Sequence, residues 1–207
     1  MATPMTPSDA ELLQLIVAGD EPAFTALYRR HQGFVYRFAL MMSGSTDVAE
    51  EVTQEVFLAL IRDTHGYDPA RGALDAYLRG MARNQVLRLL ARERPYVPLV
   101  EEAEEGAAVL ITQLIARDDQ FRDCTRNEVI KLVRQAVLAL PIHYREVLVL
   151  CDFQELSHAE AALVLDCPVG TVNSRLHRGH ALLLKRLRVI GKIDSAARDT
   201  QGTRCFA

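Results

Sequence analysis

The sequence predicts an all-α protein in which a flexible acidic linker joins two small helical domains, the second of which contains a helix-turn-helix. Apolar residues recur at helical spacing along most of the 207 residues, and no persuasive run of alternating strand residues appears. Closely spaced prolines precede an acidic stretch near the middle of the chain, which indicates a domain boundary. Near the C-terminus, a Pro-Val-Gly turn separates two short amphipathic segments.

The first domain is expected to span residues 1–95 and to contain four helices. Ser8 or Asp9 can cap the first helix, which Gly19 ends, and Asp20 can cap the second. A Ser-Gly-Ser break precedes the third helix, and two prolines follow the fourth. From these signals, the helices are expected near residues 9–18, 21–42, 46–62 and 73–94.

The second domain is expected to span residues 127–190, after a linker at residues 96–126. Within the linker, the apolar run AAVLITQLIA could form a short helix that docks on a neighbouring domain. The tail, residues 191–207, is polar and is expected to be loose. The helices of this domain are expected near residues 127–140, 141–151, 157–165 and 170–188.

The net charge of −3 hides a strong segregation of charge along the chain. Six arginines lie between Arg71 and Arg94 against two acidic residues, and six basic residues lie between Gly170 and Lys192 with no acidic residue. The linker is acidic. This asymmetry predicts two basic surfaces that bind phosphates, with an acidic segment between them.

Several classes of protein are disfavoured by the sequence. No apolar run approaches the roughly 18 residues of a membrane span, and the N-terminus lacks the pattern of a secretory signal. A cytoplasmic protein with no membrane insertion is therefore expected. The four cysteines form no C-x-x-C pair, and no histidine cluster has metal-ligand spacing, so reduced thiols, no metal and no cofactor are expected. Cys205 is either a redox handle or incidental.

The stretch LSHAEAALVLDCPVGTVNSRLHRGH is the helix-turn-helix candidate. Ser157 and Glu160 fit a capping box at the start of its first helix. Pro168 prevents that helix from continuing, and Asp166 takes the place of a turn glycine, since aspartate tolerates left-handed backbone geometry.

The second helix of this candidate has two different faces. One face is apolar and glycine-containing, whereas the opposite face has hydroxyls and arginines near the N-terminus of the helix. A recognition helix needs such groups for base edges and phosphates, while a packing helix with a solvated basic face is the alternative. The apolar face consists of Val172, Leu176, Gly179, Leu183 and Leu187, and the polar face of Thr171, Ser174, Arg175 and Arg178.

Three stretches together resemble the bacterial extracytoplasmic-function sigma factors, group 4 of the sigma-70 superfamily. VLALPIHYREVLVL and the P-V-G-T-V-x-S-R-L-x-R core resemble the domain that reads the promoter −35 element. DVAEEVTQEVFLALIR resembles the helix that binds polymerase, and AYLRGMARNQVLRLLARER resembles the helix that reads and helps melt the −10 element. The resemblance implies a non-enzymatic subunit that binds core RNA polymerase and directs promoter-specific transcription initiation.

The resemblance also implies roles for individual residues. Tyr77 stands where the family usually has Trp, so its ring either stacks on DNA or packs at the domain edge; the loop 65–72 either captures a flipped −10 base or is a plain connector. The −35 contacts are expected from Thr171, Asn173, Ser174, Arg175, His177 and Arg178, and the −10 contacts from Tyr67, Arg71, Tyr77, Arg83, Asn84 and Arg88.

The helix 46–62 is expected to dock on core polymerase through an acidic face with one exposed leucine. By resemblance, its partner is the clamp coiled coil of the largest subunit, with the flap region and an anti-sigma factor as further partners. The buried stripe is expected to consist of Val48, Val52, Val56 and Ala59, and the docking face of Asp47, Glu51, Gln54, Glu55 and Leu58.

Some alternatives stay open at this point. A helix-turn-helix regulator with an N-terminal ligand or dimerisation domain would act without replacing a sigma subunit. A helical enzyme would use His31, His143 or His158, although packing, turns and capping explain these histidines better. The glutamates of the linker either imitate nucleic acid in polymerase channels or form a hydrated tether. Lys185, Arg186 and Arg188 are either phosphate contacts or solvated charges.

Overall fold

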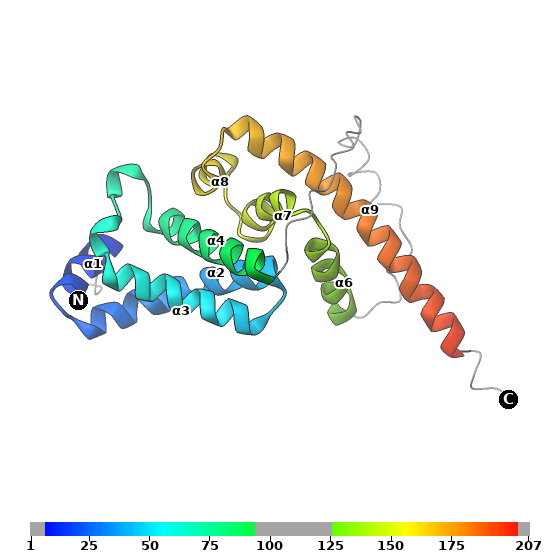
Figure 1. Ribbon diagram of the computed structural model, residues 1–207, viewed down its shortest axis with the longest axis horizontal. Helices are drawn as coiled ribbons and strands as arrows, with labels where there is room; N and C mark the ends of the chain where they lie inside the picture. The colour runs from blue at the N-terminus through cyan, green and yellow to red at the C-terminus, as the bar shows by residue number, and fades with distance from the viewer. Residues whose placement is uncertain (1–6, 94–125, 203–207) are drawn as a thin grey trace, which may run out of the picture. The chain divides into compact units, whose positions relative to one another are not determined.

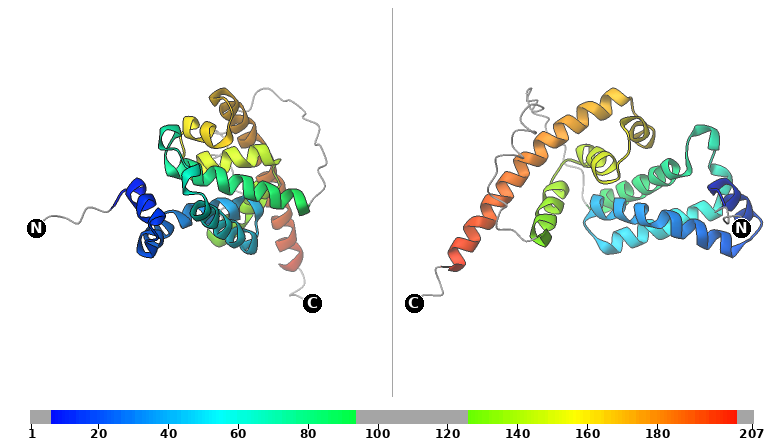
Figure 2. Two further views of the ribbon diagram at one scale, coloured as in Figure 1. Left: turned by 60° about the vertical axis from the view of Figure 1, so that its left-hand side comes forward. Right: turned by 180° about the vertical axis from the view of Figure 1, so that it is seen from behind.

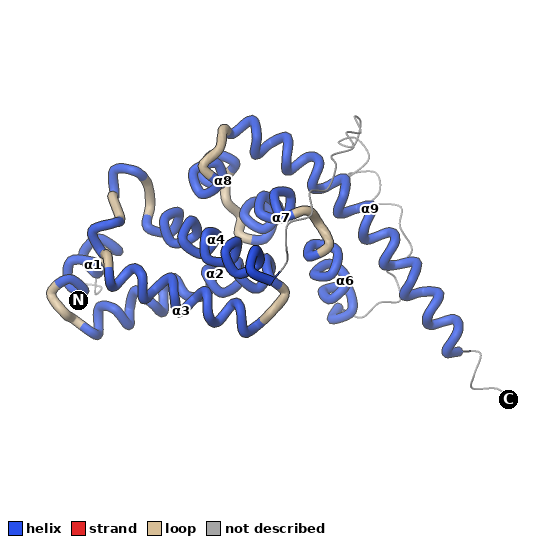
Figure 3. The backbone as a smooth tube through the Cα atoms, viewed as in Figure 1, coloured by secondary structure: helices blue, strands red, loops and turns tan. Residues whose placement is uncertain are grey.

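The computed structural model describes residues 7–93 and 126–202, and these residues are helical almost throughout (Figure 1). The described ranges contain no strand (Figure 3), which confirms the predicted all-α class. The chain divides into two compact units, which we call the N-terminal unit, residues 1–96, and the C-terminal unit, residues 97–207; only residues 163–166 are grouped with the N-terminal unit instead. None of the described helices is long and apolar enough to cross a membrane. The expectations for the linker and for Cys205 lie outside the described residues.

In the N-terminal unit, α2 packs against all three of the other α-helices, and α3 also packs against α4. Figure 2 shows α2 and α3 lying side by side from two further directions. Two short 3-10 turns connect α3 to α4. The bounds are α1 Asp9–Val17, α2 Glu21–Ser43, α3 Thr46–Arg62, η1 Thr64–Gly66, η2 Pro69–Arg71 and α4 Leu74–Glu93.

The helix ends of this unit form where the sequence predicts them. Ser8 is the N-cap of α1 in a reciprocal capping box with Glu11. Gly19 follows α1 with a positive φ of 87°, and Asp20 caps α2 by accepting from the amide of Ala23 at 2.8 Å. These local contacts mark where α1 begins and ends and where α2 begins.

The core of the N-terminal unit is aliphatic and aromatic. The predicted buried stripe of α3 is right for Val52 and Val56 but wrong for Val48 and Ala59, which are only half-buried. A helix buries a band wider than one residue per turn, and here the band is centred nearer Thr53. The buried residues of α3 are Ala49, Val52, Thr53, Val56, Phe57 and Leu60. This helix packs on α2, whose buried residues include Leu27, Val35, Phe38 and Met42, and on α4, whose buried residues include Leu74, Leu78, Ala82 and Val86.

In the C-terminal unit, the long helix α9 packs on α6 and α7. The core includes Leu148, Leu150 and Val172, each fully buried. The bounds are α6 Arg126–Leu138, α7 Ile142–Leu148, η4 Val149–Phe153, α8 His158–Leu165 and α9 Val169–Gly202.

Two expectations for this unit need correction. The helix predicted at 141–151 ends as an α-helix at Leu148 and continues as the π-helical turn η4. The loose tail predicted from residue 191 is wrong as far as Gly202, because α9 continues to that residue. A single glycine inside a helix costs only about 1 kcal/mol, and no proline follows Gly191 to stop the helix.

Candidate nucleic-acid interfaces and docking surface

The start of α8 has the predicted capping box. The amide and the hydroxyl of Ser157 donate to the Glu160 carboxylate at 2.8 Å and 2.7 Å, and the Glu160 amide donates back to the Ser157 hydroxyl at 3.3 Å. The first helix of the helix-turn-helix therefore begins where the sequence predicts.

The turn between α8 and α9 is a Schellman motif with aspartate in the place of glycine. Asp166 has a φ of +50°, as its position in the sequence predicts. The amide of Asp166 donates to the carbonyl of Leu163 at 3.4 Å, and that of Cys167 donates to the carbonyl of Ala162 at 3.1 Å. The carbonyl of Pro168 then accepts from the amides of Thr171 and Val172 in the first turn of α9. The turn thus satisfies two carbonyls at the end of α8.

The second helix of the helix-turn-helix, α9, has the two faces that the sequence predicts. Val172 and Leu176 are buried with Gly179, whereas Leu183 and Leu187 are half-buried. The hydroxyl of Ser174 donates to the carbonyl of Thr171 at 3.0 Å, which leaves its lone pairs to accept. Of the predicted −35 residues, Asn173, Ser174 and Arg178 are exposed, and Thr171, Arg175 and His177 are half-buried.

The predicted −10 residues lie on α4 and on the loop before it. Asn84 and Arg88 are exposed, and Arg88 donates to the side-chain oxygen of Gln85. Arg83 is half-buried. Arg71 ends η2, and its side chain is outside the described part. The α4 surface therefore presents an amide and a guanidinium to solvent one helical turn apart.

Tyr67 and Tyr77 are half-buried and face each other, with ring centroids 5.6 Å apart. The Tyr67 hydroxyl donates to the carbonyl of Gly72 at 3.1 Å, across the loop. A Cβ at Gly66 would lie 2.9 Å from the Tyr77 hydroxyl, so this loop glycine leaves room for the ring. The Tyr77 ring therefore packs against the loop before α4.

One arginine of the first basic stretch does not belong to this surface. Arg79 is only 9% exposed, and its guanidinium carbon lies 4.1 Å from the centroid of the Phe34 ring. It also forms an ion pair with Asp75 at 3.3 Å. The count of arginines in the sequence therefore overstates the charge available to phosphates.

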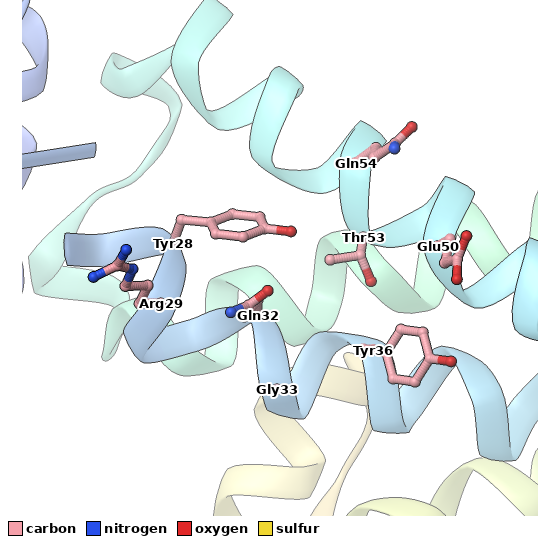
Figure 4. Close-up of a pocket in the computed structure, with 8 residues that line it drawn as sticks. All are labelled: Tyr28, Arg29, Gln32, Gly33, Tyr36, Glu50, Thr53 and Gln54. Atoms are coloured by element: carbon pink, nitrogen blue, oxygen red, sulfur yellow. The ribbon is translucent and has the colours of Figure 1, made fainter. Parts of the chain in front are cut away.

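The face of α3 predicted to bind polymerase is open to solvent. Asp47, Glu51 and Gln54 are exposed, Glu55 is half-buried, and Leu58 is 42% exposed. Beside this face, a groove of about 440 Å³ lies between α2 and α3 (Figure 4). Gln54 belongs to both the face and the groove. The groove is lined by Tyr28, Arg29, Gln32, Gly33 and Tyr36 of α2 and Glu50, Thr53 and Gln54 of α3.

Comparisons with known proteins identify the family. The model of sigma-70 region 2 matches residues 27–96, and that of sigma-70 region 4 matches residues 130–183. The ECF RNA polymerase sigma factor SigM of Mycobacterium tuberculosis is 32% identical over 184 residues, 87% of this chain and 85% of SigM. The chain belongs to the extracytoplasmic-function family of RNA polymerase sigma factors.

Other relatives agree with this sigma-factor assignment. The ECF RNA polymerase sigma factor SigW of Bacillus subtilis is 29% identical over 178 residues, 85% of this chain and 95% of SigW. The structure of CnrH in complex with the cytosolic domain of CnrY has a TM-score of 0.60 and 25% identity, covering 86% of this chain and 96% of CnrH.

As a sigma factor, the protein directs RNA polymerase to promoters and so determines where transcription begins. The match to sigma-70 region 2 accounts for the N-terminal unit, which the alternative of a helix-turn-helix regulator would assign to ligand binding or dimerisation. The comparisons therefore favour the sigma factor over that alternative.

Sequence reasoning missed two polar clusters of the sigma factor. In the N-terminal unit, His31 is buried between Asp9 and Asp75. In the C-terminal unit, His180 of α9 contacts Asp152 of η4. The members of each cluster are distant in the sequence, so no local spacing pattern indicates either one.

Proposed function

We propose that this sigma factor binds promoter and polymerase through three separate surfaces. The domains are a region 2-like one at residues 1–95, which binds core polymerase and the −10 element, and a region 4-like one at 127–190, which binds the −35 element. The segment 96–126 links them. The family matches at residues 27–96 and 130–183 support this division.

The −35 duplex is bound by the first turns of α9. The observation that carries this proposal is the exposure of Asn173, Ser174 and Arg178 opposite the buried Val172 and Leu176. Amide, hydroxyl and guanidinium groups on one helical face can hydrogen-bond to base edges in the major groove and to phosphates. Thr171, Arg175 and His177 complete the surface.

The −10 strand is captured by α4 and the loop before it. Exposed Asn84 and Arg88 can hydrogen-bond to an opened strand and neutralise its phosphates. Tyr67 and Tyr77 provide aromatic rings beside them, and Arg71 and Arg83 add positive charge. Since the Tyr77 ring packs against the loop, its role is to support the loop that captures a flipped base.

Core polymerase makes two contacts with the protein. The clamp coiled coil of its largest subunit binds to the acidic face of α3, and its flap region binds to the region 4-like domain. The exposed Leu58, flanked by Glu51 and Glu55, suits a basic helical partner with an apolar centre. Because Gln54 lies on the neighbouring groove, a side chain of the partner can enter that groove.

We further propose that a protein inhibitor of the anti-sigma class holds this chain inactive. The support is the structural likeness to CnrH, which was solved with the cytosolic domain of CnrY. The protein acts in the cytoplasm, where its polymerase is, and it has no catalytic activity of its own.

In-vitro transcription with purified core polymerase and a promoter library tests these proposals. We expect transcripts from promoters that share −35 and −10 motifs. Arg175→Ala should weaken selectivity at the −35 element alone, whereas Lys185→Ala should weaken binding to all DNA and lower the salt slope by about one. Equal effects of both substitutions on every promoter would remove Arg175 from base recognition.

A further inference from the structure

His31 lies on α2 between carboxylates from two other helices. The imidazole is only 3% exposed. Its Nδ1 lies 2.9 Å from Oδ1 of Asp75, in the first turn of α4, and its Nε2 lies 3.1 Å from Oδ1 of Asp9, in the first turn of α1. A neutral imidazole has one N–H, so only the protonated ring can offer a proton to both carboxylates.

The charged groups around His31 favour its protonated form. Burial lowers the pKa of His31, but the hydrogen bond to Asp75 and the contacts with Asp9 outweigh it, and the pKa is raised above its ordinary value. Among the described side chains, Arg30 pairs with Asp9 at 2.5 Å and Arg79 with Asp75 at 3.3 Å. The contact at Nε2 is a charge contact without the alignment of a hydrogen bond.

A proton suits this cluster better than a metal ion does. One donor atom from each of Asp9, His31 and Asp75 lies within 4.8 Å of the others. However, each carboxylate already pairs with a cationic side chain, Asp9 with Arg30 and Asp75 with Arg79.

The cluster of Asp9, His31 and Asp75 lies next to the loop that precedes α4. Asp75 lies two residues before Tyr77, which supports the loop through Tyr67 and Gly66. After burial, the negative charge of Asp9 also raises the pKa of Tyr67 in this loop. The first turns of α1 and α4 therefore meet at His31, and the loop directly precedes the α4 turn.

We propose that protonated His31 is a positioning residue for promoter opening, because it holds the start of α4 and the loop 63–73 in the form that captures the −10 strand. The inference rests on the −10 role proposed above for Tyr67 and Tyr77. Loss of the proton removes the positive charge that joins Asp9 to Asp75, which then keep only Arg30 and Arg79 as their separate partners, and this loosens the loop. Capture of the −10 strand is therefore strongest at acidic to neutral pH and weakens in alkaline solution.

The direction of the pH effect follows from the raised pKa. The link is complete below the ordinary histidine pKa of about 6.5 and is lost as the pH rises through the higher pKa of the folded state. Asp75 remains ionised over this range, since its own pKa is lowered, mainly by its hydrogen bond with His31.

The first test measures the loop in the free, full-length protein. Amide protection factors of residues 63–79 are followed by hydrogen exchange from pH 6 to 9, beside an NMR titration of the His31 ring. Wild type should lose roughly threefold to tenfold protection as His31 titrates. The protection factors of His31→Gln should be low at every pH. Those of His158→Gln, at an exposed site, should follow the wild-type profile. Protection factors that stay constant while His31 titrates would overturn the proposal.

A second variant keeps the test decisive if His31→Gln does not fold. Asp75→Asn removes one carboxylate at a 44% exposed side chain. It should lower the pKa of His31 and move the loss of loop protection to lower pH by the same interval. A changed titration with an unmoved protection profile would separate His31 from the loop and overturn the proposal.

The final test uses holoenzyme and fork DNA whose −10 strand is single-stranded, taken from a promoter selected in the library. Wild-type affinity should fall between pH 6.5 and 9 by roughly threefold to tenfold more than that of His31→Gln. Equal pH dependence of the two would overturn the positioning role. Absence of −10 binding at both pH values would instead contradict the proposed −10 surface, and the exchange data would still decide on His31.

Discussion

Nε2 of His180 lies 2.6 Å from Oδ2 of Asp152, so a polar contact ties α9 to the π-helical turn η4. Both side chains are about one-third exposed, at 31% and 37%. Short π-helical turns often occur at functional sites. Here the π-helical turn η4 supplies the carboxylate of Asp152. The pair fixes α9 close to the residues of the same helix that we propose to bind the −35 element.

Asp152→Asn and His180→Ala should each weaken binding to −35 duplex DNA by about twofold to threefold. The pair is partly solvated, so its coupling energy should be near 0.5 kcal/mol. Fluorescence anisotropy at several pH values, combined with the double variant, measures that coupling directly. Strictly additive effects of the two substitutions would mean that the contact does not position the helix.

The stability of the N-terminal unit should depend on the ionised form of Asp75. Its pKa is lowered, first by the hydrogen bond with His31 and then, against burial, by Arg79. A lowered pKa contributes stability that is present above the ordinary value near 3.8 and is lost as the pH falls through the folded-state value. Urea unfolding of Asp75→Asn should show a loss of about 1 kcal/mol at pH 6, after allowance for its exposure, and a flatter decline between pH 5 and 3. Asp47→Asn, an exposed aspartate in the first turn of α3, should keep the wild-type profile.

Two arginines of α4 should respond differently to the same substitution. Arg79→Gln removes a buried guanidinium that lies over Phe34 and pairs with Asp75, so the free energy of unfolding should fall by about 2 kcal/mol. Arg88→Gln should change stability by less than about 0.5 kcal/mol but weaken binding to single-stranded DNA and lower its salt slope. Denaturant titrations and binding at two salt concentrations distinguish the two roles, and identical profiles would contradict the burial difference.

Substitution of two glycines in α9 should reveal how closely this helix packs. A Cβ at Gly179 would lie 3.2 Å from Cδ1 of the buried Leu148, whereas one at Gly170 would meet nothing within 4 Å. Gly170→Ala should therefore stabilise the C-terminal unit by up to about 1 kcal/mol through helix propensity. Gly179→Ala should be close to neutral, because the same gain is offset by displacement of Leu148, and Gly179→Val should cost about 2 kcal/mol. Equal gains for both alanine variants, measured by thermal unfolding, would show that Leu148 moves without cost.

The sequence predicts the features of this protein that depend on neighbouring residues. The capping box at Ser157, the helix stop at Gly19 and the left-handed Asp166 all follow from side-chain chemistry within a few positions, and all three are present. The two faces of α9 follow equally well from helical periodicity.

Features that depend on distant residues could not be predicted in this way. The burial of Arg79 results from a partner ring on α2 and a carboxylate on its own helix, so its charge alone suggested a solvent-exposed role. His31 meets carboxylates from α1 and α4 only after the helices pack. Likewise, the π-helical turn replaces the end of an expected α-helix without any local breaker in VLCDF.

The helix α8 lies between two left-handed residues, Glu155 with φ 58° before it and Asp166 with φ 50° after it. Both side chains are exposed, a condition that usually leaves a position free to vary. At these two positions the backbone sets the limit instead, because β-branched residues and proline fit this conformation poorly. In a population of random variants, tolerance at residues 155 and 166 would therefore follow backbone geometry, with glycine and asparagine accepted, even though neither side chain needs to touch anything.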